Sequence, residues 1–176
     1  MTVEARCHLG LPVVIDVPPI LDDGTPFPTT HWLTCPLATV RISRLESQGG
    51  VKDADRRIAA DPDLAVRWSV AMNRYAEQRS RRLPADHDGP VPTGGVAGSQ
   101  WGVKCLHAQF ADTAAGNANP IGAEVAAEVE PLDCASACVH VSDGVVARDP
   151  SWVEPMPGDP MPVDPMSGDT RSADPR

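Results

Sequence analysis

A cysteine and a histidine two residues apart, Cys105 and His107, are the residues of this sequence whose types and spacing point most directly to chemistry. Thiolate and imidazole are the groups from which proteins build zinc sites, and a structural zinc site takes four such ligands in a tetrahedral array. A glycine-rich segment precedes the pair. The remaining ligands of a metal site would therefore have to come from elsewhere in the chain.

The sequence offers four further thiols, at Cys7, Cys35, Cys134 and Cys138. None of them forms the closely spaced Cys-x-x-Cys pair that most strongly indicates zinc. Cys134 and Cys138 would share a face if they lay on one helical turn, and they could then chelate together. The leading interpretation is a site built from Cys7, Cys35 and Cys105, completed by His107 or by Cys138.

The spacing of Cys105 and His107 leaves three arrangements open. Residues i and i+2 lie about 200° apart on a regular helix, so both could not easily reach one metal. They would converge on an extended segment, where alternate side chains point the same way, or in an irregular first turn of a helix. In the third arrangement only Cys105 binds the metal, and His107 either supports a ligand or takes part in catalysis.

Zinc is the leading metal, and an iron–sulfur cluster, which takes cysteine thiolates, is the alternative. Two interpretations need no metal. Cys134 and Cys138 could form a dithiol redox switch, or the cysteines could pack in the core as small apolar residues, as free cysteine often does.

Length, charge and hydropathy exclude several classes of protein. A chain of 176 residues predicts one domain. Its net charge of −9 argues against nucleic-acid binding. No apolar run approaches the roughly 20 residues of a membrane span, and Pro12 and Asp16 interrupt the N-terminal apolar stretch, so no signal peptide is expected. The expected location is the cytoplasm, where cysteines serve metal or redox chemistry more often than disulfides.

The pattern of apolar residues, prolines and glycines predicts an α+β fold. Strands are expected over 11–17 and 30–34, joined by a proline-rich loop, with a third and fourth strand in a hairpin over 139–147. Helices are expected from Cys35-Pro36 to Gly49-Gly50 and over 51–60, 62–83, 103–115 and 121–129. The expected result is one small antiparallel sheet of N- and C-terminal strands packed on four or five helices. Residues 1–148 would form the domain, and the acidic, Pro/Met-rich repeat at 149–176 would be disordered.

The longest predicted helix carries an arginine every seven residues, at Arg67, Arg74 and Arg81. The ordinary interpretation of such a row is a solvated face. The sharper interpretation is a surface that binds an acidic protein or a small anion.

Several stretches of the chain resemble a family of uncharacterised, mainly actinobacterial proteins, the domain of unknown function 501 family. The matching stretches are Arg6-Cys7, Gly10-Leu11-Pro12, Asp23-Gly24-Thr25-Pro26-Phe27-Pro28-Thr29, Trp32-Leu33-Thr34-Cys35-Pro36, Arg44-Leu45-Glu46, Asp61-Pro62-Asp63-Leu64, Val103-Lys104-Cys105-Leu106-His107-Ala108 and Asn119-Pro120-Ile121-Gly122. The resemblance implies that Cys7, Cys35, Cys105 and His107 belong to shared motifs. It implies no activity, because the family has none established.

Three functions therefore follow from the sequence as hypotheses. The first is a cytoplasmic metal-binding protein with zinc at a Cys/His site. The second is an enzyme that uses the metal, or the Cys105 thiolate, on a small anionic substrate, with Arg41, Arg44 or Lys104 as the counter-charge. The third is a protein-interaction module without a metal site.

Overall fold

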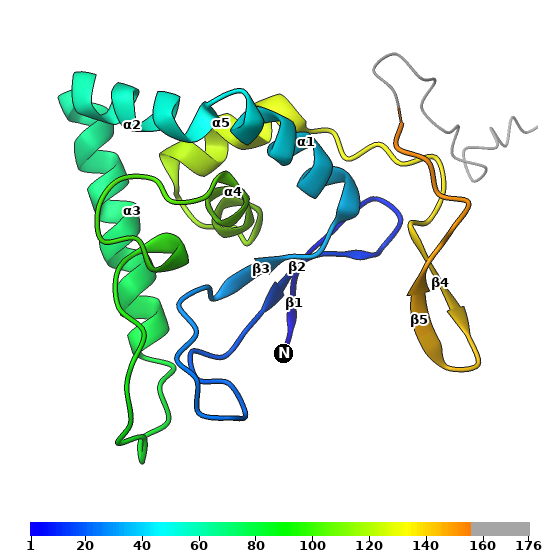
Figure 1. Cartoon of the computed structure of the whole chain (residues 1–176), viewed down its shortest axis with the longest axis horizontal. Helices are drawn as coiled ribbons and strands as arrows, with labels where there is room; N and C mark the ends of the chain where they lie inside the picture. Colours follow the sequence, from blue (N-terminus) through cyan, green and yellow to red (C-terminus); the bar gives the residue numbers. More distant parts are fainter. Residues whose placement is uncertain (156–176) are drawn as a thin grey trace, which may run out of the picture. The chain divides into compact units, whose positions relative to one another are not determined.

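The computed structural model describes residues 1–155, and the chain divides into two compact units, Met1–Leu132 and the residues from Asp133 onward. Each unit carries its own small antiparallel sheet, and five helices lie in the first (Figure 1). The predicted α+β class is confirmed. Most of the predicted disordered tail lies outside the described residues. None of the described helices combines the length and the apolar character needed to cross a membrane.

The sheet of the first unit has the strand order β1 (Val3–Arg6), β2 (Pro12–Asp16) and β3 (His31–Leu33). β2 and β3 pair antiparallel, as expected for the two strands that flank the proline-rich loop. Their register sets His31 opposite Asp16 and Leu33 opposite Val14, which is fully buried. The short strand β3 therefore holds His31 at a fixed position on the sheet.

The prediction of one sheet shared by N- and C-terminal strands is wrong. β4 (Val139–Ser142) and β5 (Val145–Arg148) pair with each other as a separate two-stranded sheet of the second unit. The two-residue turn between them places Asp143 and Gly144 at positive φ, which is the conformation that short hairpin turns require. The two strands therefore pair directly with each other. The predicted hairpin itself is confirmed.

Three helices of the first unit begin at a proline that follows a cap residue, as the sequence predicts. They are α1 (Pro36–Ser47), α3 (Pro62–Ser80) and α5 (Pro120–Val129). Asp61 caps α3 by accepting hydrogen bonds from the amides of its first turn, and Asn119 caps α5 in the same way. The short helix α2 (Gly50–Ala60) joins α1 to α3.

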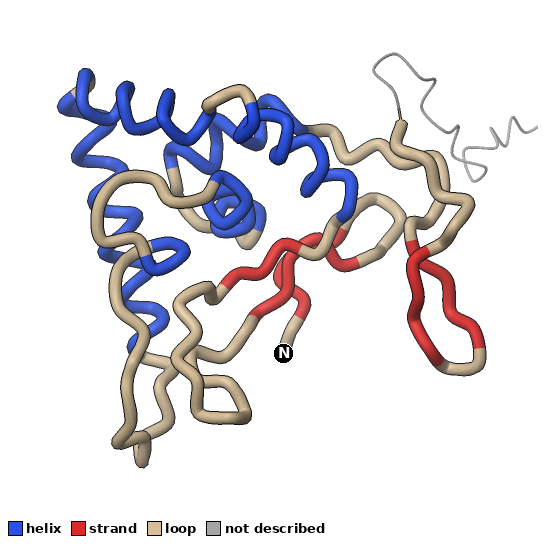
Figure 2. Tube along the Cα trace, viewed as in Figure 1, coloured by secondary structure: helices blue, strands red, loops and turns tan. Residues whose placement is uncertain are grey.

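The remaining helix, α4 (Leu106–Ala114), contacts α1, α5, β2, β3 and the short 3-10 helix η1 (Val96–Gly98). Six of its nine residues are buried, so it is the central element of the unit (Figures 1 and 2). α4 begins three residues later than predicted. The Val103 and Leu106 amides donate to the carboxylates of Asp55 (2.7 Å) and Glu46 (2.6 Å), and Cys105 between them is extended.

Helix α5 packs against α4 at Gly122, where a side chain has no room. A Cβ atom at this position would overlap the backbone carbonyl oxygen of Gln109 and the hydroxyl of Thr113. The glycine therefore sets how closely the two helices approach, and it fixes α5 and its cap residue Asn119 against the central helix.

We predict that Gly122→Ala lowers the free energy of unfolding by roughly 1–3 kcal/mol, the usual cost of forcing extra atoms into a packed core. Urea unfolding followed by circular dichroism measures the change. Gly89→Ala is the matched control, because the atoms nearest to a Cβ there belong to the side chain of His87 in the same loop and not to a packed core. Equal stability of wild type and Gly122→Ala would contradict this account of the contact.

Candidate functional site

Cys105 and His107 converge at the N-terminus of α4. Cys105 is the cap residue and is extended, with φ −159° and ψ 125°, while His107 is the second residue of the helix. The Cys105 Sγ and the His107 Nδ1 are 3.8 Å apart. The geometric difficulty posed by a regular helix therefore does not arise, because the helix begins after Cys105.

A carboxylate from α1 completes a three-residue cluster, which we call the Cys-His-Glu cluster: Cys105, His107 and Glu46. The Oε1 atom of Glu46 lies 3.2 Å from the Nδ1 of His107. The sulfur, nitrogen and oxygen atoms all lie within 4.8 Å of one another. Within residues 1–155, no other group of three Cys, His, Asp or Glu side chains brings its ligand atoms so close together.

The other ring nitrogen of His107, Nε2, faces α1. It lies 3.1 Å from the backbone carbonyl oxygen of Thr39 and 3.2 Å from the hydroxyl of Ser43. In the metal-free protein the pKa of His107 is raised to about 9, chiefly by the hydrogen bond with Cys105. Partial burial opposes this rise, whereas the Thr39 carbonyl and the negative charge of Glu46 contribute to it.

The other cysteines named by the sequence lie outside this cluster. Cys7 is half-buried in the turn between β1 and β2, and Cys35 is the buried cap residue of α1. Cys134 and Cys138 belong to the second unit, where they lie in the irregular segment before β4 and not on a helical turn. No disulfide joins any of the five cysteines, all of which lie in the described part of the chain.

Glu46 was not among the predicted ligands. It precedes Cys105 by 59 residues, and no local spacing connects the two. The one available signal was its place in the Arg44-Leu45-Glu46 stretch, which is among the motifs that carried the family resemblance.

A cavity of about 270 Å³ opens beside the Cys-His-Glu cluster, with Cys105 and His107 in its wall. Most of the rest of the wall is apolar. The other lining residues are Thr29, His31, Trp32, Leu33, Thr39, Ala97 and Ala108. Ala97 has a positive φ of 55°, an unfavourable backbone conformation for a residue with a side chain. No lysine, arginine, aspartate or glutamate contributes to the wall.

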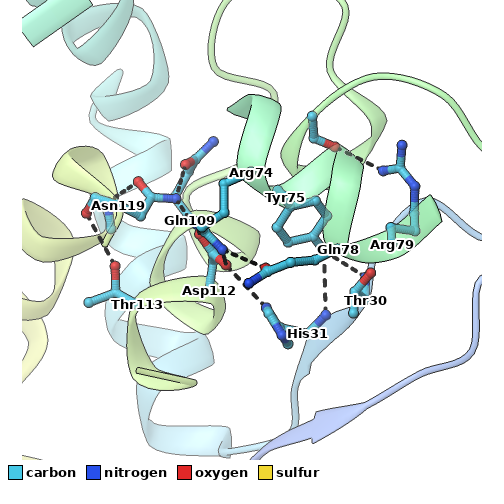
Figure 3. Close-up of polar contacts among 12 residues, drawn as sticks. Thr30, His31, Arg74, Tyr75, Gln78, Arg79, Gln109, Asp112, Thr113 and Asn119 are labelled. Atoms are coloured by element: carbon cyan, nitrogen blue, oxygen red, sulfur yellow. Dashed lines mark hydrogen bonds and ion pairs between the residues drawn. The ribbon is translucent and has the colours of Figure 1, made fainter. Parts of the chain in front are cut away.

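A buried polar network lies beside the cavity and centres on Asp112 of α4, which is fully buried (Figure 3). Both carboxylate oxygens accept hydrogen bonds from the guanidinium of Arg74, at 3.2 and 2.5 Å. The Nδ1 of His31 lies 3.2 Å from one oxygen, and the Asn119 amide donates to the other at 3.0 Å. Although burial opposes ionisation, these partners together lower the pKa of Asp112, so the carboxylate is charged.

The arginine row on α3 does not form one uniform face. Arg67 is exposed and Arg81 makes an exposed ion pair with Glu77, whereas Arg74 turns inward to Asp112. The middle of α3 packs against α4, where its buried residues share a core cluster with Ala108 and the carboxylate of Asp112 pairs with Arg74. The row therefore offers less anion-binding surface than its spacing predicts.

A family model described as "Protein of unknown function (DUF501)" matches residues 3–127, more than half of the chain. The matched range lies within the first unit and includes the Cys-His-Glu cluster, the cavity wall and Asp112. This match confirms the resemblance expected from the sequence motifs. Comparison with curated proteins and with solved structures gives no match.

We predict that Asp112→Asn lowers the free energy of unfolding by roughly 3–5 kcal/mol, because it leaves the half-buried Arg74 guanidinium without its counter-charge. Chemical denaturation measures the loss. Glu77→Gln on α3, the helix that carries Arg74, is the control, since it breaks an exposed Arg–Glu pair and should cost less than about 1 kcal/mol. Similar losses in both variants would show that Asp112 is not the buried anchor described above.

The raised pKa of His107 predicts a pH dependence of stability in the metal-free protein. The protonated ring is favoured in the folded state, so its stabilising contribution is complete below pH 6.5, the ordinary value, and is lost as pH rises through about 9. Urea unfolding at about pH 6 and about pH 10 measures the fall. His107→Gln should reduce it, whereas His87→Gln, whose ring contacts the Pro90 carbonyl of its own loop, should retain it. An unchanged fall in His107→Gln would contradict the assignment.

Proposed function

The chain belongs to the DUF501 family of proteins of unknown function, and we propose that it binds one zinc ion through Cys105, His107 and Glu46. Thiolate, imidazole and carboxylate are the three ligand types that zinc sites use. The observation that carries the proposal is that the Nδ1 of His107 faces both the Cys105 sulfur and the Glu46 carboxylate.

The spacing of these atoms suits a tetrahedral ion. Zinc–ligand bonds of roughly 2.0–2.3 Å separate neighbouring ligands in a tetrahedron by roughly 3.3–3.6 Å. The sulfur–nitrogen distance is 3.8 Å and the nitrogen–oxygen distance is 3.2 Å. All three ligand atoms lie within 4.8 Å of one another, so side-chain rotations alone would be enough to bring them to bonding distance.

The second nitrogen of His107 supports the same proposal. Metal-binding histidines almost always donate their other ring N–H to a carboxylate, a backbone carbonyl or water. Here the Thr39 carbonyl lies 3.1 Å from Nε2 and is an acceptor only. With zinc bound at Nδ1, the ring proton would be held on Nε2, where the Thr39 carbonyl can accept its hydrogen bond.

Three protein ligands leave one coordination position for water or substrate, which is the pattern of catalytic zinc sites and not of structural ones. Cys105 and His107 lie in the wall of the cavity, so a ligand there can reach that position. Zinc is favoured over an iron–sulfur cluster, because such clusters are held by several cysteine thiolates and the Cys-His-Glu cluster contains one.

A second candidate function is thiol chemistry without a metal. The pKa of His107, raised to about 9 chiefly by the hydrogen bond with Cys105, favours a charged imidazolium beside the sulfur. Such a ring would stabilise a thiolate, as in cysteine nucleophiles paired with histidine. The two candidates differ in metal content.

We predict one equivalent of zinc per chain in protein purified without chelator or histidine tag. Cys105→Ser, His107→Gln and Glu46→Gln should each weaken zinc retention by about tenfold or more, because each removes one of three ligands. Elemental analysis after dialysis against a competing chelator measures the loss.

Cys7→Ser and Cys35→Ser are the matched controls, because each removes a thiol from the same unit without touching the Cys-His-Glu cluster. Both should retain wild-type zinc. The proposal is wrong if these two variants lose the metal while Glu46→Gln keeps it. A metal-free wild type in which Cys105 is alkylated fastest of the five thiols would instead favour thiol chemistry.

A further inference from the structure

His31 lies in the wall of the same cavity as Cys105 and His107, and it is held in one orientation. Its Nδ1 lies 3.2 Å from the buried carboxylate of Asp112, and its ring packs edge-on against Tyr75 with centroids 5.6 Å apart. The Tyr75 hydroxyl also accepts a hydrogen bond from the Thr30 amide at 2.6 Å, which fixes the start of β3. Both the backbone and the ring of His31 are therefore positioned before any ligand arrives.

The carboxylate of Asp112 determines which nitrogen of His31 carries a proton. It accepts a hydrogen bond from Nδ1–H, so in the neutral ring Nε2 is the basic nitrogen. Nε2 has no hydrogen-bond partner among residues 1–155. A buried aspartate that orients a histidine in this way is the arrangement that hydrolytic enzymes use to position a general base.

Ala108 and Asp112 lie one turn apart on one face of α4, and Cys105 is the cap residue just before the first turn. Ala108 is small, and it lines the cavity between the two polar positions. The cavity is therefore bordered by the Cys-His-Glu cluster near the start of this face and by the Asp112–His31 pair toward its end.

The wall of the cavity restricts the substrate. No lysine or arginine is present to bind a phosphoryl group, so a phosphate ester is disfavoured. No pair of carboxylates is present to hydrolyse a glycoside. The volume of about 270 Å³ lies near the lower limit of ligand pockets, which is roughly 300 Å³. An uncharged acyl compound fits these constraints, in place of the anionic substrate that the sequence alone suggested.

We propose that the cavity hydrolyses a small uncharged ester or amide, with His31 as the general base and Asp112 as its positioning residue. Water forms a bond to the acyl carbon and gives its proton to Nε2 of His31. The bond from the acyl carbon to the leaving group then breaks, and His31 passes the proton to that group. The proposal rests on the proposed function, because zinc would polarise the acyl oxygen or the water.

The test uses the zinc-loaded full chain and three chromogenic probes: 4-nitrophenyl acetate, 4-nitrophenyl phosphate and 4-nitrophenyl glucoside. The wild type should hydrolyse the acetate and neither of the others. His31→Ala should lower kcat by about 100-fold or more, the usual contribution of a general base, with little change in KM. Added imidazole should restore part of the loss, because it can occupy the space left by the ring.

His87→Gln is the control, since it removes an imidazole from a loop outside the cavity wall and should keep full activity. Zinc content and circular dichroism are measured for every variant. A zinc-loaded wild type that hydrolyses the acetate no faster than His31→Ala overturns this proposal and leaves the zinc site standing. Absence of zinc from the wild type overturns the proposed function. Activity of the zinc-free protein that is lost in His31→Ala and restored by added imidazole would still support the role of His31.

The role of Asp112 is tested by combining variants. If Asp112 acts through His31, Asp112→Asn lowers kcat in the wild-type background and has no further effect on kcat in His31→Ala. Both measurements are made at a temperature at which circular dichroism shows the variants folded. Equal and additive losses in the two backgrounds would contradict positioning through His31.

Discussion

The first unit depends on one buried charge, the carboxylate of Asp112 on the central helix. A charge out of water is costly unless it is paired and hydrogen-bonded. Asp112 is fully buried, and it is bound by Arg74 from α3, His31 from β3 and Asn119, the cap residue of α5. Three elements are therefore oriented against α4 by a single side chain. This pairing sets the position of β3 relative to α4, and thus the shape of the cavity between them.

The N-terminal end of the same helix is positioned by two other carboxylates. Asp55 on α2 and Glu46 on α1 accept hydrogen bonds from the Val103 and Leu106 amides, and the extended segment between them ends at Cys105. Because α4 begins only after Cys105, the thiol and the imidazole of His107 can face one point. In the proposed zinc site Glu46 would serve twice, as a cap of α4 and as a ligand. Ligand geometry and helix start would then depend on the same side chain.

The sequence predicted the local features of the fold well. Proline after a cap residue located the starts of α1, α3 and α5, and the apolar strands around the proline-rich loop located β2 and β3. These features depend on a few neighbouring residues. The start of α4 was predicted three residues too early, because the carboxylates that hold residues 103–105 outside the helix come from α1 and α2.

The candidate site was predictable only in part for the same reason. Cys105 and His107 are close in sequence and were identified, but Glu46, His31 and Asp112 reach the site through long-range packing. Arg74 illustrates the limit most clearly. Its seven-residue spacing from Arg67 and Arg81 indicated one solvated face, yet its partner is a buried carboxylate 38 residues away. Periodicity describes a helix surface and does not identify the neighbour that covers it.

The most direct test of the central claim is the zinc X-ray absorption spectrum of the purified protein. The account predicts one sulfur scatterer at roughly 2.3 Å and three nitrogen or oxygen scatterers at roughly 2.0–2.2 Å, from His107, Glu46 and a water molecule. Two or more sulfur scatterers would contradict it, because Cys105 is the one cysteine of the Cys-His-Glu cluster. That result would favour a metal site built from several cysteines, which is the site that the sequence alone suggested.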